Sequence, residues 1–252
     1  MSEKETDEKL YERALKELKR GKFPGDFDVK LRMCDPKPGE KVLDIGCGIG
    51  WFAAAVASQY RAEVLAIDAS EYAINEARKR YGNVNNLDFQ VCDALLMEYE
   101  EVFDRILCFD VLEHFSYEDA QTLLKKMYKA LKEGGSQVLC VPINDVGHLP
   151  PVRKLAKFLN IPTFEHKTFF SMQGIEAELR RVGFSILELS PWFYMEDQLR
   201  MMLPHRIYSL PLIGKYLVGS VNIRAVKNSC APSSFPRYHG ETSNLVNTLV
   251  QR

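Results

Sequence analysis

The stretch from Val42 to Phe52 constrains the fold of this chain more than any other, because an apolar segment runs directly into a turn of alternating glycines. It reads Val-Leu-Asp-Ile-Gly-Cys-Gly-Ile-Gly-Trp-Phe, with glycines at positions 46, 48 and 50. Consecutive apolar residues suit a strand that is buried on both faces of a parallel sheet. Closely spaced glycines permit a tight turn and let a ligand approach bare backbone amides at a helix start. The stretch therefore predicts a strand, a loop and a helix that hold a nucleotide-like ligand.

The spacing of the glycines separates two kinds of nucleotide site. A dinucleotide-binding loop has the pattern Gly-x-Gly-x-x-Gly, with the pyrophosphate at the helix N-terminus. This chain has Gly-x-Gly-x-Gly instead, and Asp44 stands two residues before the first glycine. A carboxylate at the mouth of the loop repels a pyrophosphate and attracts a cation. The loop thus disfavours a nicotinamide or flavin dinucleotide.

Strand and helix patterns alternate along the chain on either side of this loop. Apolar and β-branched runs predict strands over residues 41–45, 63–68, 87–91, 103–109, 137–141, 184–190 and 221–226. Helical spacing and capping residues predict helices over 51–59, from Ser70 onward, from Ser116 to Leu131 and over 171–182. Such alternation predicts an α/β fold with a doubly wound, mainly parallel seven-stranded sheet, an antiparallel last strand and helical insertions.

Three parts of the chain fall outside the alternation. Residues 1–40 carry apolar side chains at helical spacing, including Tyr11 and Leu15, and predict a helical cap that covers the core or lids the site. The main domain, 41–227, contains insertions at 144–170 and 191–220. Because ligands bind beyond the carboxyl ends of parallel strands, the first insertion is well placed to form a lid or a substrate wall. The polar residues 228–252 are expected to be disordered.

Composition limits the partners of the chain. Basic residues number 33 and acidic residues 34, a balance that argues against nucleic acid as the main partner. The six cysteines lack paired spacing and indicate a reduced, cytoplasmic protein. No apolar run approaches the roughly 20 residues of a membrane span. The apolar residues 201–217 leave open a surface subdomain, an apolar substrate contact or a peripheral membrane contact, and the oligomeric state stays open too.

Four motifs, in this order, resemble those of the class I S-adenosylmethionine-dependent methyltransferases. They are the loop from Asp44 to Gly50, then Asp68, then Cys92-Asp93-Ala94, and finally the segment from Phe109 to Phe115. Each motif alone is weak, whereas their joint order and spacing are specific. The likeness is greatest to the small-molecule branch that includes ubiquinone-biosynthesis O-methyltransferases and cyclopropane fatty-acid synthases. It implies the Rossmann-like methyltransferase fold.

The resemblance also implies S-adenosylmethionine as the cofactor and S-adenosylhomocysteine as its product. In that family the glycine loop wraps the methionine portion, the acid after the second strand receives the ribose hydroxyls, and the third motif meets the adenine. The expected cofactor-binding residues are therefore Asp44, Gly46, Cys47, Gly48, Gly50, Asp68, Ala69, Asp93, Ala94 and Phe109. The expected acceptor is a small molecule, lipid-like or quinone-like, which attacks the methyl group in line with the departing sulfur.

The catalytic candidates are Asp110, His114 and His166. If the segment after the 103–109 strand is helical, Asp110, Glu113 and His114 project from one face of that helix. Some members of the family bind a divalent metal through such an acid-x-x-Glu-His motif, while others with Leu-Glu-His need none. Oxygen ligands with one imidazole would suit Mg²⁺ or Mn²⁺. No metal is the favoured prediction, and a divalent metal stays the alternative.

Two other classes of function share the cofactor motifs. One is a methyltransferase-like protein that binds the cofactor as a sensor or scaffold without catalysis, which cofactor motifs cannot distinguish from an enzyme. The other is a protein or RNA methyltransferase, which the neutral charge and the lack of an evident recognition domain disfavour. The favoured prediction is an enzyme that methylates a small molecule.

Overall fold

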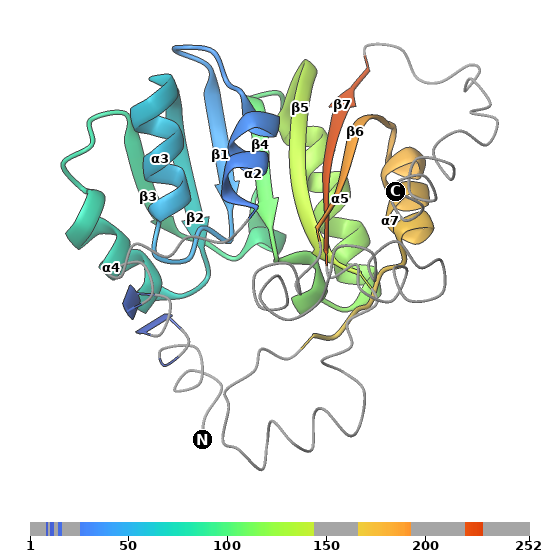
Figure 1. Ribbon diagram of the computed structural model, residues 1–252, viewed down its shortest axis with the longest axis horizontal. Helices are drawn as coiled ribbons and strands as arrows, with labels where there is room; N and C mark the ends of the chain where they lie inside the picture. Colours follow the sequence, from blue (N-terminus) through green and yellow to red (C-terminus); the bar gives the residue numbers. More distant parts are fainter. Residues whose placement is uncertain are drawn as a thin grey trace, which may run out of the picture.

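The described residues form one seven-stranded sheet with helices on both faces (Figure 1). The computed structural model describes residues 26–143, 166–192 and 220–228, together with Lys9, Tyr11, Glu12, Leu15 and Lys16. Its strands are β1 (Lys41–Ile45), β2 (Glu63–Asp68), β3 (Leu87–Val91), β4 (Phe103–Phe109), β5 (Leu131–Pro142), β6 (Phe184–Trp192) and β7 (Ser220–Lys227).

The strand order is β3-β2-β1-β4-β5-β7-β6. Strands β1 to β5 pair in parallel, whereas β7 runs antiparallel to both of its neighbours, β5 and β6. The prediction of a mainly parallel seven-stranded sheet with an antiparallel last strand is therefore confirmed. The order reverses between β1 and β4, and such a switch point is where ligands bind in open α/β sheets.

The helices divide into two layers that bury two separate apolar clusters. The α-helices are α2 (Phe27–Cys34), α3 (Trp51–Tyr60), α4 (Glu71–Tyr81), α5 (Tyr117–Ala130) and α7 (Met172–Val182), and two short 3₁₀ turns are η1 (Ala94–Leu96) and η2 (Leu112–His114). Helices α2, α3 and α4 cover one face, while α5 and α7 cover the other. Alternate residues of β1 enter opposite clusters: Val42 joins one, and Leu43 and Ile45 the other. Burial on both faces explains why this strand has apolar residues at consecutive positions, with Asp44 as the exception.

Serine caps fix where three helices begin. The hydroxyl oxygens of Ser70, Ser116 and Ser171 accept hydrogen bonds from the backbone N–H groups of Ala73, Asp119 and Gly174. These bonds satisfy amides that have no partner within the helix. At the end of α7, Gly183 adopts a left-handed conformation, φ 119°, and its N–H donates to Leu179 and Arg180. Local chemistry therefore sets these boundaries close to the predicted positions.

Strand β5 begins earlier than the predicted 137–141 strand. Leu131 already pairs with Phe103, whereas the next pair along the ladder joins Ser136 to Arg105. The residues between bulge out, with Gly134 at φ 73°. The sequence pattern alone indicates a turn at Gly134-Gly135 that ends the preceding helix before the strand begins. A bulge within a strand uses glycine as well, so the sequence does not distinguish the two.

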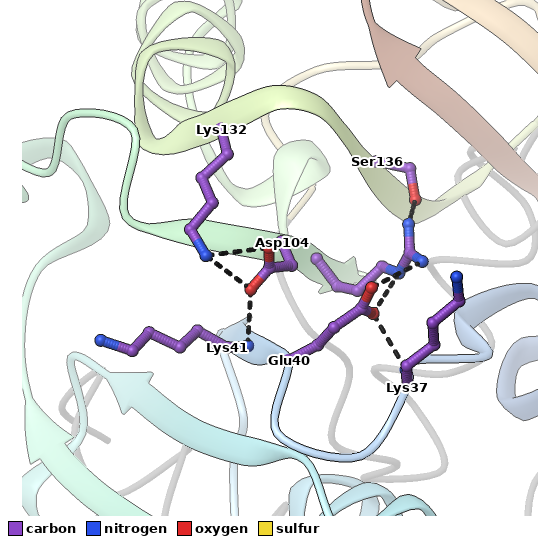
Figure 2. A network of polar contacts seen from close by, with 7 residues as sticks. Lys37, Glu40, Lys41, Asp104, Lys132 and Ser136 are labelled. Atoms are coloured by element: carbon purple, nitrogen blue, oxygen red, sulfur yellow. Dashed lines mark hydrogen bonds and ion pairs between the residues drawn. The ribbon is translucent and has the colours of Figure 1, made fainter.

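Polar side chains join the strands at the amino ends of β1, β4 and β5 (Figure 2). The Asp104 carboxylate accepts hydrogen bonds from the Lys41 backbone N–H at 2.8 Å and from Lys132 Nζ at 2.9 Å. Arg105 lies between Glu40, with Nε–Oε2 3.1 Å, and Ser136, with Nη1–Oγ 2.8 Å. This network ties together the edge of the sheet opposite to the carboxyl ends. The carboxyl ends are left for a ligand.

Several expectations fall on residues outside the described part of the chain. They include residues 144–165 and 193–219 of the two insertions, residues 229–252 of the expected tail, and most of residues 1–25. Within the helical cap expected over 1–40, Lys9, Tyr11, Glu12, Leu15 and Lys16 are helical, and α2 follows. None of the helices in the described ranges combines the length and apolar character needed to span a membrane.

Candidate cofactor and acceptor site

The four predicted motifs meet at one edge of the sheet. The glycine loop follows β1, Asp68 ends β2, Asp93 follows β3 and Asp110 follows β4. Since these strands are parallel neighbours, their carboxyl ends lie side by side. The fold thus brings together residues that are far apart in the sequence, as the motif order predicts.

The loop glycines are required by backbone conformation and by packing. Gly46, Gly48 and Gly50 have φ angles of 70°, 52° and 77°, in the left-handed region that favours glycine. A side chain at Gly46 would overlap Val111 of the fourth motif, and a Cβ at Gly50 would lie 2.5 Å from Phe89 Cε1. A Cβ at Gly48 would have Tyr11 Cε1 as its nearest neighbour, at 3.2 Å. The loop therefore packs against Val111 and Phe89, and the Tyr11 ring lies beside Gly48.

Asp68 links the glycine loop to the start of α4. Its Oδ2 accepts a hydrogen bond from Gly48 N at 2.8 Å, and its Oδ1 accepts one from Ser70 N at 2.8 Å. A carboxylate offers about four acceptor positions, and these backbone donors use both of its oxygens. The backbone of the same residue reaches the third motif, since Cys92 N donates to Asp68 O at 2.9 Å. Asp68 therefore orders the loop as well as facing the site.

The neighbours of Asp68 leave the site open. Ala69 and Asp93 are exposed, while Cys47 and Ala94 are buried beneath them. The Asp93 carboxylate accepts a hydrogen bond from Leu95 N at 2.9 Å and so caps η1. Phe109 packs edge-on against Phe52, with ring centroids 4.9 Å apart. Of these predicted cofactor-binding residues, Cys47 and Ala94 are buried, whereas Ala69 and Asp93 are accessible to a ligand.

Asp44 is a buried acid within β1. Burial raises the pKa of its carboxyl to about 8, and the negative charge of Asp68 adds to the rise. At neutral pH the carboxyl is therefore mostly protonated unless a positive group lies beside it. A buried acid of this kind fits the cation-attracting role that its position before the glycines predicts.

The fourth motif does not form the α-helix on which one prediction depended. Asp110 takes a left-handed conformation, φ 55°, and the following turn, η2, is a 3₁₀ helix of three residues. Asp110 is accordingly separated from Glu113 and His114, with which it would share a helical face. Asp110 pairs with Lys30, with Oδ2–Nζ 3.4 Å, and lies outside the group that contains Glu113 and His114.

His166 takes the expected place of Asp110 beside Glu113 and His114. One nitrogen or oxygen from each of these three residues lies within 4.8 Å of the other two. The rings of His114 and His166 have centroids 5.3 Å apart and an interplanar angle of 74°. The group holds two imidazoles and one carboxylate, a set that suits a transition metal better than the Mg²⁺ expected from an oxygen-rich set.

Backbone hydrogen bonds bring His166 to the fourth motif. The N–H groups of Lys167 and Thr168 donate to Glu113 O at 2.7 and 3.1 Å, and Thr168 Oγ1 donates to Phe115 O at 2.7 Å. Sequence patterning singled out both histidines but could not pair them, because main-chain groups of any residue type make these bonds.

Two residues at this edge were missed by the sequence prediction. Lys30, on α2, is buried and forms ion pairs with Asp26 at 3.1 Å and Asp110 at 3.4 Å. Tyr11 lies against Gly48. For Lys30 the available signal was a lysine between the apolar residues Val29 and Leu31. For Tyr11 the available signal was its position on the apolar face of the helix predicted near the start of the chain.

Comparisons with known proteins agree with this architecture. Residues 42–135 match the family model described as a methyltransferase domain. Phosphoethanolamine N-methyltransferase 2 of Caenorhabditis elegans is 33% identical over 123 residues, which cover 46% of this chain and 28% of that protein. A probable fatty acid methyltransferase of Pseudomonas putida is 25% identical over 167 residues, covering 65% of this chain and 42% of that protein.

The fold recurs in phosphoethanolamine N-methyltransferase 2 of Haemonchus contortus, a structure described as a complex with S-adenosyl-L-methionine. The two structures superpose with a TM-score of 0.61 and 20% identity, covering 81% of this chain and 52% of that one. The sheet order, the glycine loop and the strand-end acids define a Rossmann-like methyltransferase fold. Residues 42–135 thus match a methyltransferase domain, and the described residues share the fold of a methyltransferase solved with S-adenosyl-L-methionine. It spans less than two thirds of the length of the curated relatives it matches.

Replacement of Asp44 by asparagine tests the burial of its charge. The pKa of Asp44 in the folded protein lies above its ordinary value of 3.8. The folded state therefore binds the extra proton, and the free energy of unfolding falls as pH rises from the ordinary value toward about 8. We expect Asp44→Asn to increase the free energy of unfolding of the ligand-free protein near pH 8, by about 1–3 kcal/mol.

Urea unfolding at several pH values measures this effect. The gain in the free energy of unfolding should shrink toward about pH 4, where the buried Asp44 carboxyl of the wild type is as neutral as the asparagine that replaces it. Asp93→Asn, at an exposed strand-end acid, serves as the matched control and should show no such pH-dependent gain. A loss of stability in Asp44→Asn near pH 8 would contradict the assignment of a buried, charge-destabilised carboxyl.

Proposed function

We propose that this protein transfers a methyl group from S-adenosylmethionine to a small-molecule acceptor. The observation that carries the proposal is the hydrogen-bonded unit of the glycine loop and Asp68, placed directly beside the fourth motif. Gly48 N and Ser70 N both donate to Asp68, and Val111 packs on Gly46. A cofactor on the first two motifs would thus lie next to the residues that handle the acceptor.

The residues at this edge fit S-adenosylmethionine. Asp44 is a buried acid that gains from a positive neighbour, such as the positively charged end of the cofactor. Asp68 supplies at the end of β2 a carboxylate, a group whose two oxygens match two adjacent ribose hydroxyls. The exposed Asp93 and the buried Ala94 suit the adenine amino group and ring. When bound, the cofactor supplies an electrophilic methyl group on a positively charged sulfur.

The protein's share of the reaction is to orient the acceptor, exclude water and remove a proton. Orientation alone contributes several kcal/mol to such a transfer. His166 lies beside His114 of the fourth motif, and histidine is the most frequent general base. We assign one of these imidazoles to accept the acceptor's proton and the other to hold it in place. Asp110, on the other side of η2, is assigned to bind the acceptor.

The acceptor is proposed to be a small polar or lipid-related molecule. By their names, the relatives act on phosphoethanolamine and on fatty acids. Balanced charge argues against a polyanionic macromolecule as the acceptor. Phosphoethanolamine and a phospholipid acyl chain are therefore the first acceptors to try, followed by a catechol as a quinone-like hydroxyl acceptor.

A methyl-transfer assay tests the proposed activity. With S-adenosylmethionine labelled in its methyl group, we expect label to enter at least one of these acceptors and S-adenosylhomocysteine to form in equal amount. The same mixture without acceptor is the blank. Calorimetric binding of S-adenosylmethionine with no transfer to small molecules, proteins or RNA would instead identify a cofactor-binding protein without catalysis.

Removal of the Asp68 carboxylate tests the cofactor pocket. Asp68→Ala leaves Gly48 N and Ser70 N without their acceptor and removes the proposed ribose partner. We expect the binding free energy of S-adenosylhomocysteine to weaken by about 1.5–3 kcal/mol, as measured by calorimetry. Asp88→Ala, at an exposed acid on β3, is the matched control and should bind like the wild type. Unchanged affinity in Asp68→Ala would overturn the pocket assignment.

Single substitutions test the histidine pair. We expect His114→Asn and His166→Asn each to lower kcat by about 100-fold or more, because a general base contributes about 100- to 10,000-fold. Lys167→Ala is the control, since its exposed side chain is lost while its backbone bond to Glu113 O is kept. Cofactor affinity should stay within threefold in all three variants. Wild-type turnover in both histidine variants would contradict the assignment.

A chelator separates proton transfer from metal binding at the same residues. If Glu113, His114 and His166 act without a metal, turnover persists in EDTA. Loss of turnover in EDTA, restored by Mn²⁺ or Zn²⁺ but not in His166→Asn, would assign the group to a metal instead.

A further inference from the structure

We propose that Lys30 is a positioning residue: from beneath the site, together with the Cys140 thiol, it fixes the Asp110 carboxylate that meets the acceptor. The inference rests on the proposed function, because it assumes that Asp110 contacts the acceptor. Lys30 itself is not placed in contact with either reactant. It acts through the carboxylate that it holds.

Both oxygens of Asp110 are held from the interior side. Lys30 Nζ lies 3.4 Å from Oδ2, and Cys140 Sγ donates to Oδ1 at 3.4 Å. The Asp110 side chain is 46% exposed, whereas that of Lys30 is only 8% exposed. Two donors occupy two of about four acceptor positions on a carboxylate. The remaining positions are available on the open side, where an amine or hydroxyl of the acceptor would donate.

The backbone of Asp110 is held in an uncommon conformation. Its φ of 55° is in the left-handed region, which few residues other than glycine adopt. Its N–H donates to Cys140 O at 3.0 Å, so the backbone and the side chain both bond to the same residue of β5. Such a conformation persists only where the surroundings enforce it, and it occurs often at functional sites.

A buried chain of polar contacts fixes Lys30 in turn. Asp26 Oδ2 lies 3.1 Å from Lys30 Nζ and also accepts from Asn222 Nδ2 at 3.2 Å. Asp26 and Asn222 are both buried, and the Phe109 ring centroid lies 5.0 Å from Nζ. These contacts reach from β7 through α2 to the end of β4. A lysine held at this depth has little freedom to move away from Asp110.

The protonation states of Lys30 and Cys140 allow both side chains to donate to Asp110. Burial by itself lowers the pKa of Lys30, but the neighbouring Asp110 and Asp26 carboxylates hold it above its ordinary value. Burial raises the pKa of Cys140, so this side chain is a neutral thiol that donates to Asp110. With Lys30 positive and two carboxylates negative, the cluster keeps one net negative charge. Only the Asp110 end of that charge is exposed, which favours an acceptor that presents a hydrogen-bond donor.

A double-mutant cycle tests whether Lys30 acts through Asp110. The variants are Lys30→Met, Asp110→Asn and the combination, assayed with labelled S-adenosylmethionine and phosphoethanolamine. We expect Lys30→Met to lower kcat by about 10- to 100-fold, since a misplaced group costs about that much. Affinity for S-adenosylhomocysteine should change less than threefold. In the Asp110→Asn background, Lys30→Met should have no further effect on kcat.

Arg32→Met is the matched control on the same helix. Its guanidinium pairs with Glu188 at 2.6 Å on the surface, with 60% of the Arg32 side chain exposed. This variant loses the same charge from α2 and should retain wild-type kcat. A loss of kcat in Arg32→Met equal to that in Lys30→Met would overturn the proposal.

A further double variant separates positioning from stability. Lys30→Met leaves the buried Asp26 carboxylate and the half-exposed Asp110 carboxylate without their cation, which can destabilise the fold. Asp26→Asn/Lys30→Met removes one of those charges and should regain stability in urea unfolding, while its kcat stays low. Recovery of kcat together with stability would show that Lys30 has a structural role only and would overturn the proposal.

An infrared measurement reads the position of Asp110 without any acceptor. The S–H stretching band of Cys140, identified by its loss in Cys140→Ala, reports the hydrogen bond from this thiol to Asp110 Oδ1. We expect the band to shift toward that of a free thiol in Lys30→Met and to stay unchanged in Arg32→Met. An unchanged band in Lys30→Met would overturn the proposal. If the band shifts while no acceptor is methylated in the wild type, the proposed function fails and the positioning of Asp110 stands.

Discussion

The structure of the site depends on the Asp68 carboxylate, which accepts hydrogen bonds from Gly48 N and Ser70 N at once. These two bonds join the loop after β1 to the helix after β2. The loop glycines can adopt many backbone conformations, so a fixed acceptor for Gly48 N helps to select the one with positive φ angles. The same carboxylate faces the open edge of the sheet. One side chain therefore joins the two segments that we propose to hold the cofactor.

Acidic residues dominate the edge around this carboxylate. Asp44 is buried beneath the loop, Asp68 borders it, and Asp110 follows the next strand, where Lys30 offsets its charge. Burial raises the pKa of Asp44, and the nearby charge of Asp68 raises it further. An acidic edge favours a positively charged cofactor. The buried Asp44 carboxyl lowers the free energy of unfolding of the ligand-free protein when it is ionised.

The sequence predicted the fold well because its signals were local. The strand ends at Ile45 and Asp68 and the serine caps at Ser70, Ser116 and Ser171 each depend on a few neighbouring residues. The start of β5 was misplaced because a glycine bulge resembles a turn. A shared helical face for Asp110, Glu113 and His114 was conditional on an α-helix after β4, and that condition is not met, because Asp110 is left-handed and its N–H bonds to Cys140 O of β5. Tertiary contacts overrode the local pattern there.

By itself, the sequence determined the α/β class, the glycine loop and the strand-end acids, since spacing along the chain fixes which residues end which strand. Tertiary structure alone decided which side chains gather around the segment that follows β4. It placed His166 beside His114 through backbone bonds to Glu113, and it set Lys30 beneath Asp110. Main-chain hydrogen bonds and buried ion pairs join residues distant in the chain, and they leave no periodic pattern in the sequence.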